Sequence, residues 1–279
     1  MADTSGAREG RRLVVMSDDF GHCEAVNEGI LRAFTDGLLT DTNLQAPCPG
    51  FREACALTRQ HSVPVGLHVT FTCDWDLVRW KPLTSMKSMV DENGYFLNSV
   101  PDAWAGADLD EAAVELRAQY DAIASEGIEM THLGEHMGVD EGGRAASVMA
   151  ALAREKNLSH KGHWAHRKHR QGYEDSNTPY YAFDSHFGTS AWRLDLAGKK
   201  ERLKRTLAAL GPGWHMWVVH AAVDHPSLDR LCSQDWHAVR WAREIRAVDY
   251  ALLTDPEIID WVEAQGIRPT PIAECPVGD

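Results

Sequence analysis

The chain lacks the cysteine and apolar patterns that would assign it to a secreted or membrane class. Its six cysteines include no CxxC pair, so we expect reduced thiols in a cytoplasmic protein and no disulfide framework. No apolar run is long enough to cross a bilayer. Residues 1–12 are small and polar, which predicts neither a signal peptide nor a membrane anchor.

Basic residues are also scarce. The chain has 28 Lys and Arg against 41 Asp and Glu, for a formal charge of -13. Nucleic-acid binders gain affinity by placing basic side chains against phosphates, so we expect no nucleic-acid partner and a neutral or cationic substrate. The one local basic tract, residues 160–170, alternates His with Lys and Arg. We expect it to be a solvated passage from strand to loop rather than a metal site.

No glycine-rich phosphate fingerprint follows any predicted strand, which disfavours an open nucleotide-binding sheet. Short apolar runs instead alternate with segments of helical periodicity in about seven βα units. That number predicts a (β/α) barrel of the TIM type, with a doubly wound sheet as the alternative. We expect a single catalytic domain over residues 1–279. Residues 73–106 are aromatic-rich and predict an ordered loop insertion.

Two adjacent carboxylates follow the first apolar run, Leu13 to Met16. They belong to the tetrapeptide Ser17-Asp18-Asp19-Phe20. An Asp after a strand often only caps the next helix. A carboxylate pair in unequal environments can instead divide two tasks, with one group holding a metal ion and the other acting as a base.

Histidines recur at the ends of other predicted strands, namely His68, His132 with His136, and His220. The carboxyl ends of barrel strands open onto one face, so these side chains should converge there. We therefore predict Asp19, His68 and His136 as ligands of one divalent metal ion in a catalytic site. The spacing of His132 and His136 would also suit one helical face, but Gly134 and Gly138 favour a turn. His132 is then a substrate residue, a residue behind the metal ligands or simply a packed histidine.

Three motifs in order resemble the YdjC-like carbohydrate deacetylase family, which includes chitooligosaccharide deacetylases. They are Ser17-Asp18-Asp19-Phe20-Gly21 with Ala25-Val26-Asn27-Glu28-Gly29-Ile30, then Val65-Gly66-Leu67-His68-Val69-Thr70, then Thr131-His132-Leu133-Gly134-Glu135-His136. The late Val218-Val219-His220 and the segment from Arg246 to Glu257 extend the resemblance over nearly the whole chain.

The resemblance implies a (β/α) barrel related to polysaccharide deacetylases, a divalent metal, and removal of an acetyl group from an N-acetylated sugar. By motif, Asp19, His68 and His136 match the metal ligands and Asp18 matches the catalytic base. The family usually has Asp-Ser where this chain has Gly134-Glu135, and Pro where it has Ala221. Glu135 could replace the missing orienting carboxylate.

The chemistry assigns further roles. We expect His220 to protonate the leaving amine, because an imidazole carries a proton near neutral pH. Arg246 could pair with Asp18 and keep it ionised, or form an ordinary surface ion pair. In the insertion, Arg79 could donate to sugar hydroxyls and Trp80 could stack on a sugar ring, unless such aromatics only anchor the loop.

Other functions stay open at this level. One alternative is a metal-dependent sugar isomerase or lyase, which usually needs a Lys base, and no Lys ends a predicted strand. Another is a carbohydrate-binding protein impaired in catalysis by the change at Gly134. Two imidazoles and a carboxylate suit Zn²⁺, and Mg²⁺ is the other candidate. The sugar, its length and the acetyl position are open, as is homo-oligomer formation.

Overall fold

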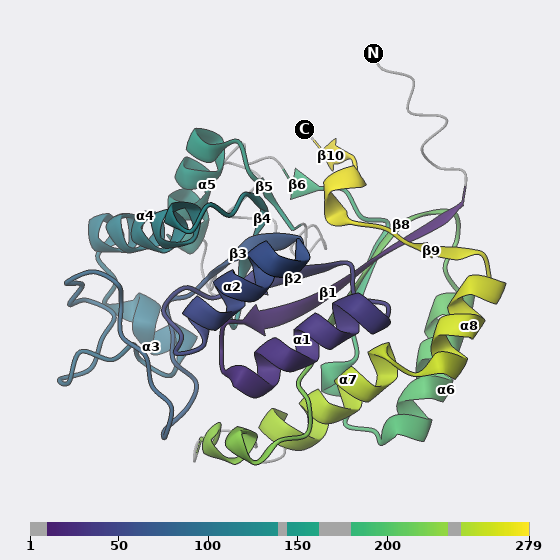
Figure 1. The fold of residues 1–279 in the computed structure, drawn as a ribbon. Coiled ribbons are helices and arrows are strands. Elements are labelled where there is room, and N and C mark those ends of the chain that lie inside the picture. Colours follow the sequence, from purple (N-terminus) through teal and green to yellow (C-terminus); the bar gives the residue numbers. More distant parts are fainter. Residues whose placement is uncertain (1–9, 139–143, 162–179, 234–240, 279) are drawn as a thin grey trace.

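A curved, almost entirely parallel sheet forms the centre of the molecule, with helices packed around it (Figure 1). The computed structural model describes residues 10–138, 144–161, 180–233 and 241–278. The strands follow the order β10-β6-β5-β4-β3-β2-β1-β8-β7, and β9 adds to β1. The prediction of a (β/α)-barrel type of fold is confirmed, although the described strands form an arc that ends at β7 and β10 rather than a closed ring.

The strands are short except for β1 and β8, which pair in parallel over seven residues from Arg11 to Ser17. Among the described strands, only β10 runs antiparallel, against β6. The strand bounds are β1 Arg11–Phe20, β2 Asp41–Leu44, β3 Val65–Val69, β4 Met130–Glu135, β5 Ser159–His160, β6 Tyr180–Tyr181, β7 Ser185–Gly188, β8 Gly213–Val219, β9 Ile267–Pro269 and β10 Val277–Gly278.

Helices connect most of the parallel strands, as βα units require. Their bounds are α1 Glu24–Asp36, α2 Phe51–His61, α3 Val100–Ala105, α4 Leu109–Ser125, α5 Arg144–Lys156, α6 Leu196–Ala208, α7 Arg246–Leu253 and α8 Pro256–Ala264. Short 3₁₀ turns occur at Ser190–Trp192, Pro226–Arg230 and Ile272–Glu274, and a π-helical turn, Trp241–Ile245, leads into α7. The sequence pattern predicts a helix from about 236 to 252, and its described part from 241 is helical, although it begins with a π-helical turn; residues 236–240 lie outside the described part.

The sequence patterns Asp108 with Glu111 and Thr254 with Glu257 predict two capping boxes, and each forms only in part. Asp108 does cap α4, accepting from the amides of Asp110 and Glu111. The Glu111 carboxylate, however, accepts from the amides of Lys87 and Ser88 in the preceding loop. At α8 the cap is Asp255, not Thr254.

Asp41 is a buried carboxyl group in the core, at the start of β2. Its Oδ2 accepts from the Ile272 amide at 2.9 Å, while its Oδ1 has no hydrogen-bond partner in the described part of the chain. Burial raises the pKa of Asp41 to about 7, although the hydrogen bonds from Thr40 and Ile272 lower it. The core therefore holds a group that prefers to be protonated.

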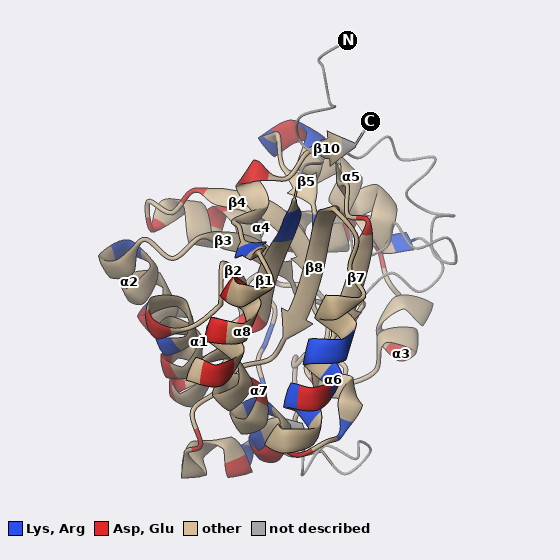
Figure 2. Cartoon of the chain, turned by 90° about the vertical axis from the view of Figure 1, so that its right-hand side faces the viewer, with Lys and Arg blue, Asp and Glu red and all other residues tan. Residues whose placement is uncertain are grey.

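The surface charges fall on the outer helices. In Figure 2, α6 carries several Lys and Arg bands and α8 carries acidic bands. Lys200 and Lys204 of α6 pair with Glu257 of α8. All six cysteines are free thiols, as the composition predicts. Within the described residues, no helix is both long and apolar enough to span a membrane.

Candidate active site

A cavity of about 380 Å³ opens at the carboxyl ends of the parallel strands. Strand β1 contributes Asp18 and Asp19, β3 contributes His68, and β8 is followed by His220. The residues predicted from sequence that line the cavity are Asp18, Asp19, His68, Glu135, His136, His220 and Arg246. The convergence expected of a barrel therefore brings together side chains up to 228 positions apart, from Asp18 to Arg246.

Asp18 and Asp19 both line this cavity although neighbours on a strand normally face opposite sides. The backbone of Asp19 has φ +73°, in the left-handed region that few residues other than Gly adopt. The pairing of β1 with β2 is irregular at the same place, between Ser17 and Phe20. The twist at Asp19 thus lets two consecutive carboxylates share one site, at a cost in local strain.

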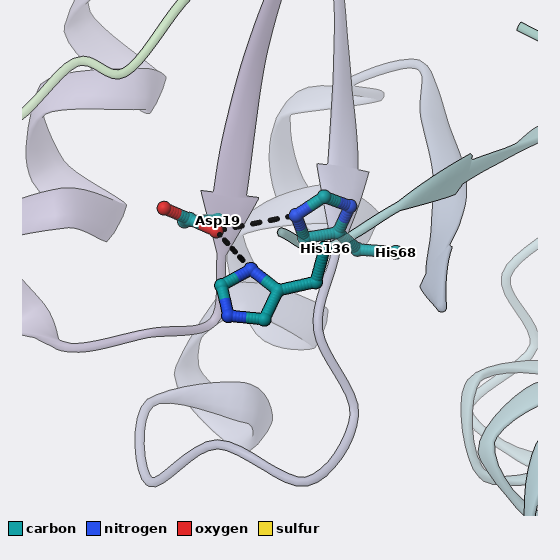
Figure 3. Close-up of side chains that lie close together, drawn as sticks. All are labelled: Asp19, His68 and His136. Atoms are coloured by element: carbon teal, nitrogen blue, oxygen red, sulfur yellow. Dashed lines mark hydrogen bonds and ion pairs between the residues drawn. The ribbon is translucent and has the colours of Figure 1, made fainter. Parts of the chain in front are cut away.

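Asp19, His68 and His136 form a compact buried group whose three ligand atoms lie within 4.8 Å of one another. Asp19 Oδ1 lies 3.2 Å from His68 Nε2 and 3.2 Å from His136 Nδ1 (Figure 3). One carboxylate oxygen and two imidazole nitrogens are a donor set that suits a divalent metal ion and leaves positions for other ligands. The predicted ligands are therefore assembled, and their binding of a metal stays a prediction.

Asp74, which the sequence did not single out, contacts the far side of His136. Its Oδ1 lies 2.8 Å from His136 Nε2. Burial lowers the pKa of His136, but the carboxylates of Asp74 and Asp19 outweigh it and raise the pKa to about 10. The two carboxylates thus favour a proton on each ring nitrogen, and a bound metal ion would displace the proton from Nδ1. A carboxylate behind a ligand histidine also fixes its tautomer.

Arg246 is buried and pairs with Asp19, not with Asp18 as predicted. Its Nη2 donates to Asp19 Oδ2 at 2.6 Å. Burial would raise the pKa of Asp19, but Arg246 and the two histidines hold it well below its usual value. Asp19 is therefore ionised, as a metal ligand must be.

Lys161 is the residue that pairs with Asp18. Its Nζ lies 3.2 Å from Asp18 Oδ1 and 3.1 Å from Oδ2, and both residues are buried. Burial would raise the pKa of Asp18, but Lys161, His68 and His220 hold it below its usual value.

Two expectations are wrong here. Residues 160 and 161 of the basic tract are buried rather than solvated, while residues 162–170 lie outside the described part. Lys161 directly follows strand β5. The absence of a Lys at the end of any predicted strand therefore no longer counts against an isomerase.

Glu135 lines the cavity but does not orient His136. Its Oε1 lies 2.5 Å from His160 Nε2, whereas Asp74 and Asp19 are the carboxylates at His136. The predicted replacement of the missing orienting carboxylate by Glu135 is wrong, because the loop after β3 supplies one from another direction.

His220 is held by a second polar chain on the opposite wall. Ser190 Oγ lies 2.9 Å from His220 Nδ1 and 2.5 Å from Asp249 Oδ2, and Asp249 Oδ1 is paired with Lys199 at 2.6 Å. A carboxylate paired with an ammonium only accepts, so the Ser190 hydroxyl donates to Asp249 and accepts from His220 Nδ1. In the neutral ring the proton is then on Nδ1, and Nε2 is the nitrogen that can take up and release a second proton. Burial, helped by Arg246, lowers the pKa of His220, against opposing effects of Asp19 and Asp18.

Two tryptophans of the insertion pack against His22 beside the ligand group. Trp75 donates from Nε1 to His22 Nε2 at 2.5 Å, and Trp80 packs edge-on against His22 with ring centroids 4.9 Å apart. Trp80 also donates to the Thr72 carbonyl. Arg79 pairs with Asp91 and with the Phe96 carbonyl.

Neither Trp80 nor Arg79 is among the described residues that line the cavity. The predicted sugar contacts of both are therefore not seen, since their polar atoms already serve the loop. The alternative, that such aromatics anchor the insertion, describes Trp80 correctly.

His132 lies inside β4, which continues to Glu135, so the predicted turn at Gly134 is wrong and the helical face is not formed either. Its ring packs directly against Gly66, where an added Cβ would lie 2.4 Å from the imidazole. Its Nδ1 is 2.8 Å from Thr131 Oγ1, and burial with Lys161 nearby lowers its pKa to about 3. His132 does not line the cavity among the described residues and fits the interpretation of a packed histidine.

Comparisons with known proteins agree on one family. Residues 12–264 match the model of the YdjC-like protein family. A carbohydrate deacetylase of Geobacillus stearothermophilus is 30% identical over 263 residues, which span 92% of this chain and 95% of that protein. A chitooligosaccharide deacetylase of Yersinia enterocolitica is 34% identical over 153 residues, 52% of this chain and 57% of that protein.

A solved structure supports the fold. It belongs to a candidate cellobiose-phosphate cleavage protein of Enterococcus faecalis and superimposes with a TM-score of 0.74. The match covers 95% of this chain and 98% of that one, at 24% sequence identity. At this identity the similarity establishes the architecture and not the activity.

Proposed function

Because the chain belongs to the YdjC-like family, we propose that it is a metal-dependent carbohydrate deacetylase that removes the acetyl group from an N-acetylated mono- or oligosaccharide. The names of the relatives in both genera support the reaction class. The observation that carries the proposal is the position of His136 between Asp19 and Asp74 beside His68. The proposed partner is the saccharide substrate, and homo-oligomer formation stays open.

The metal would be held by Asp19, His68 Nε2 and His136 Nδ1. The residues fit this role because His136 Nδ1 faces the carboxylate of Asp19 while Nε2 faces that of Asp74. With Nδ1 free to ligate, the proton on Nε2 donates to Asp74. A bound Zn²⁺ or Mg²⁺ would supply Lewis acidity toward the acetamide carbonyl and toward water.

Asp18 is the proposed general base. It lines the same cavity as the ligand group, on the neighbouring residue, and its lowered pKa keeps it ionised. An ionised carboxylate can take a proton from the attacking water. Arg246 keeps the adjacent Asp19 charged, so the two carboxylates have separate cationic partners and separate tasks.

His220 is the proposed general acid. Ser190 and Asp249 hold its Nδ1 proton, so the Nε2 proton is the one that can pass to the leaving amine. An amine is a poor leaving group unless it is protonated, which gives the histidine a defined role. Burial favours the neutral ring at rest, so His220 Nε2 takes up a proton from bulk water before it donates to the amine, and Asp18 returns the proton of the attacking water to bulk water afterwards, which balances the cycle.

A sugar isomerase is the second candidate, and the observation that favours it is Lys161 in the cavity wall. An isomerase or lyase would use such an amine as a base, whereas here the ammonium is bound to both oxygens of Asp18. Because the amine of Lys161 is already bound to Asp18, the geometry disfavours its use as a base toward the sugar.

Release of acetate together with a free amine separates these functions. Purified protein loaded with Zn²⁺ or Mg²⁺ should release equal amounts of acetate and primary amine from N-acetylglucosamine oligomers. An isomerase or lyase would convert the sugar without acetate, and a binding protein would do neither. Binding of the oligomers with no acetate under either metal would overturn the proposed activity.

A further inference from the structure

The base Asp18 is held by two buried donors from different strands. Asn43 Nδ2, on β2, lies 2.5 Å from Asp18 Oδ1. Lys161 Nζ, after β5, reaches both oxygens at 3.2 and 3.1 Å. Among the described residues, Oδ1 therefore receives two donors and Oδ2 only one. A carboxylate turns easily about its last torsion, so three such contacts select one orientation.

Lys161 reaches Asp18 across a glycine. Its backbone amide donates to the Leu133 carbonyl at 2.8 Å, which fixes it beside β4. A Cβ at Gly134 would lie 2.8 Å from Lys161 Cδ and 2.8 Å from Asn43 Oδ1. Real Cβ atoms essentially never approach other atoms so closely. Any side chain at position 134 must therefore displace groups that hold Asp18.

We propose that Lys161 is a positioning residue for Asp18, and that it can act only because position 134 has no side chain. Asn43 contacts Oδ1 alone and Lys161 reaches both oxygens, so Oδ2, with one donor instead of two, is the oxygen that takes the proton. The inference rests on the proposed function in treating Asp18 as the base. The contact of Lys161 with Asp18 and the steric requirement at Gly134 are properties of the fold that can be measured separately.

The first test separates positioning from binding. Lys161→Met keeps the length of the side chain and removes the ammonium, so Asp18 loses two of its three contacts. Since a misplacement of about 1 Å can cost about 100-fold, kcat for acetate release should fall about 10- to 100-fold, with KM and bound metal little changed. Lys200→Met is the matched control, because Lys200 pairs, within the described part of the chain, with Asp255 and Glu257 and does not line the cavity. An unchanged kcat in Lys161→Met would overturn the proposal.

The second test is a double-mutant cycle at positions 134 and 161. Gly134→Ala should lower kcat and Tm by pushing on Lys161 and Asn43. In a Lys161→Ala background the Cδ contact no longer exists and only the contact with Asn43 remains, so the same Gly134→Ala change should cost less. Coupled residues depart from additivity in this way, whereas independent sites add. Gly211→Ala, with no atom near its added Cβ, controls for the general effect of replacing Gly. Additive losses would contradict the requirement at Gly134.

A crystal structure of Lys161→Met tests the positioning role of Lys161 without an activity assay. We expect the Asp18 carboxylate to leave its present orientation while Asp19, His68 and His136 stay in place. An Asp18 that keeps its orientation without the ammonium would overturn the positioning role. A wild-type protein that releases no acetate would instead overturn the proposed function, and the crystal structure would still decide the role of Lys161.

Discussion

The contact between Asp74 and His136 yields the sharpest prediction on the metal site. Asp74 Oδ1 lies 2.8 Å from His136 Nε2 in a buried position. Asp74→Asn keeps an oxygen that can accept from this nitrogen but removes the charge. Asp74→Ala removes both and leaves a buried N–H without its partner, which costs about 1–3 kcal/mol. Loss of such a partner typically weakens metal affinity by about 10- to 100-fold, or about 1.4 to 2.7 kcal/mol.

We therefore expect metal affinity to fall about 10-fold in Asp74→Asn and about 100-fold in Asp74→Ala. Zn²⁺ competition against a chromophoric chelator, at a pH where wild type is saturated, measures both. Glu135→Gln is the matched control, because Glu135 bonds His160 rather than a proposed ligand. Equal affinity in wild type and Asp74→Ala, with both proteins folded, would refute the role of Asp74. A loss in Glu135→Gln as large as in Asp74→Ala would refute the assignment of the orienting carboxylate.

Three further outcomes are expected. Asp18→Asn should lower kcat by about 10²- to 10⁴-fold with metal content near wild type, as measured by acetate release and metal analysis; equal loss of metal would make Asp18 a ligand. His220→Ala should lose far more activity on an acetamide sugar than on an aryl acetate ester, because a phenolate leaves without a proton; equal losses would end its role as acid. Asp41 has its pKa raised from 3.8 to about 7, so the stability it confers is full below pH 4 and falls as the pH rises toward 7, by up to about 4 kcal/mol. Asp41→Asn should therefore flatten the decline of the unfolding free energy in urea between pH 5 and 7, and an unchanged slope would contradict the burial argument.

The fold and the convergence of the cavity residues could be predicted from the sequence, because both follow from the parallel arrangement of the strands. Parallel strands present their carboxyl ends to the same face, so Asp19, His68 and His220 meet there although they are far apart in the chain. The polar residues sit at strand ends, where an apolar run stops, and that boundary is visible in the sequence.

The partners of these residues could not be predicted from the same pattern. Asp74 lies in a loop, and Lys161 belongs to a tract whose composition indicates solvent. The burial of Lys161 depends on the space at Gly134, 27 positions earlier, and no local pattern shows it. Arg246 was assigned to the wrong carboxylate because the left-handed turn at Asp19 decides where each of two adjacent side chains points.

The central claim is that Asp19, His68 and His136 bind one metal ion on which acetate release depends. The most direct measurement is a titration of metal-free protein with Zn²⁺ or Mg²⁺, following bound metal per chain and the rate of acetate release together. We predict that the rate rises in proportion to bound metal and levels off at one ion per chain, and that His68→Ala and His136→Ala bind less than one equivalent. Full acetate release by metal-free protein, or full metal occupancy in both histidine variants, would contradict it.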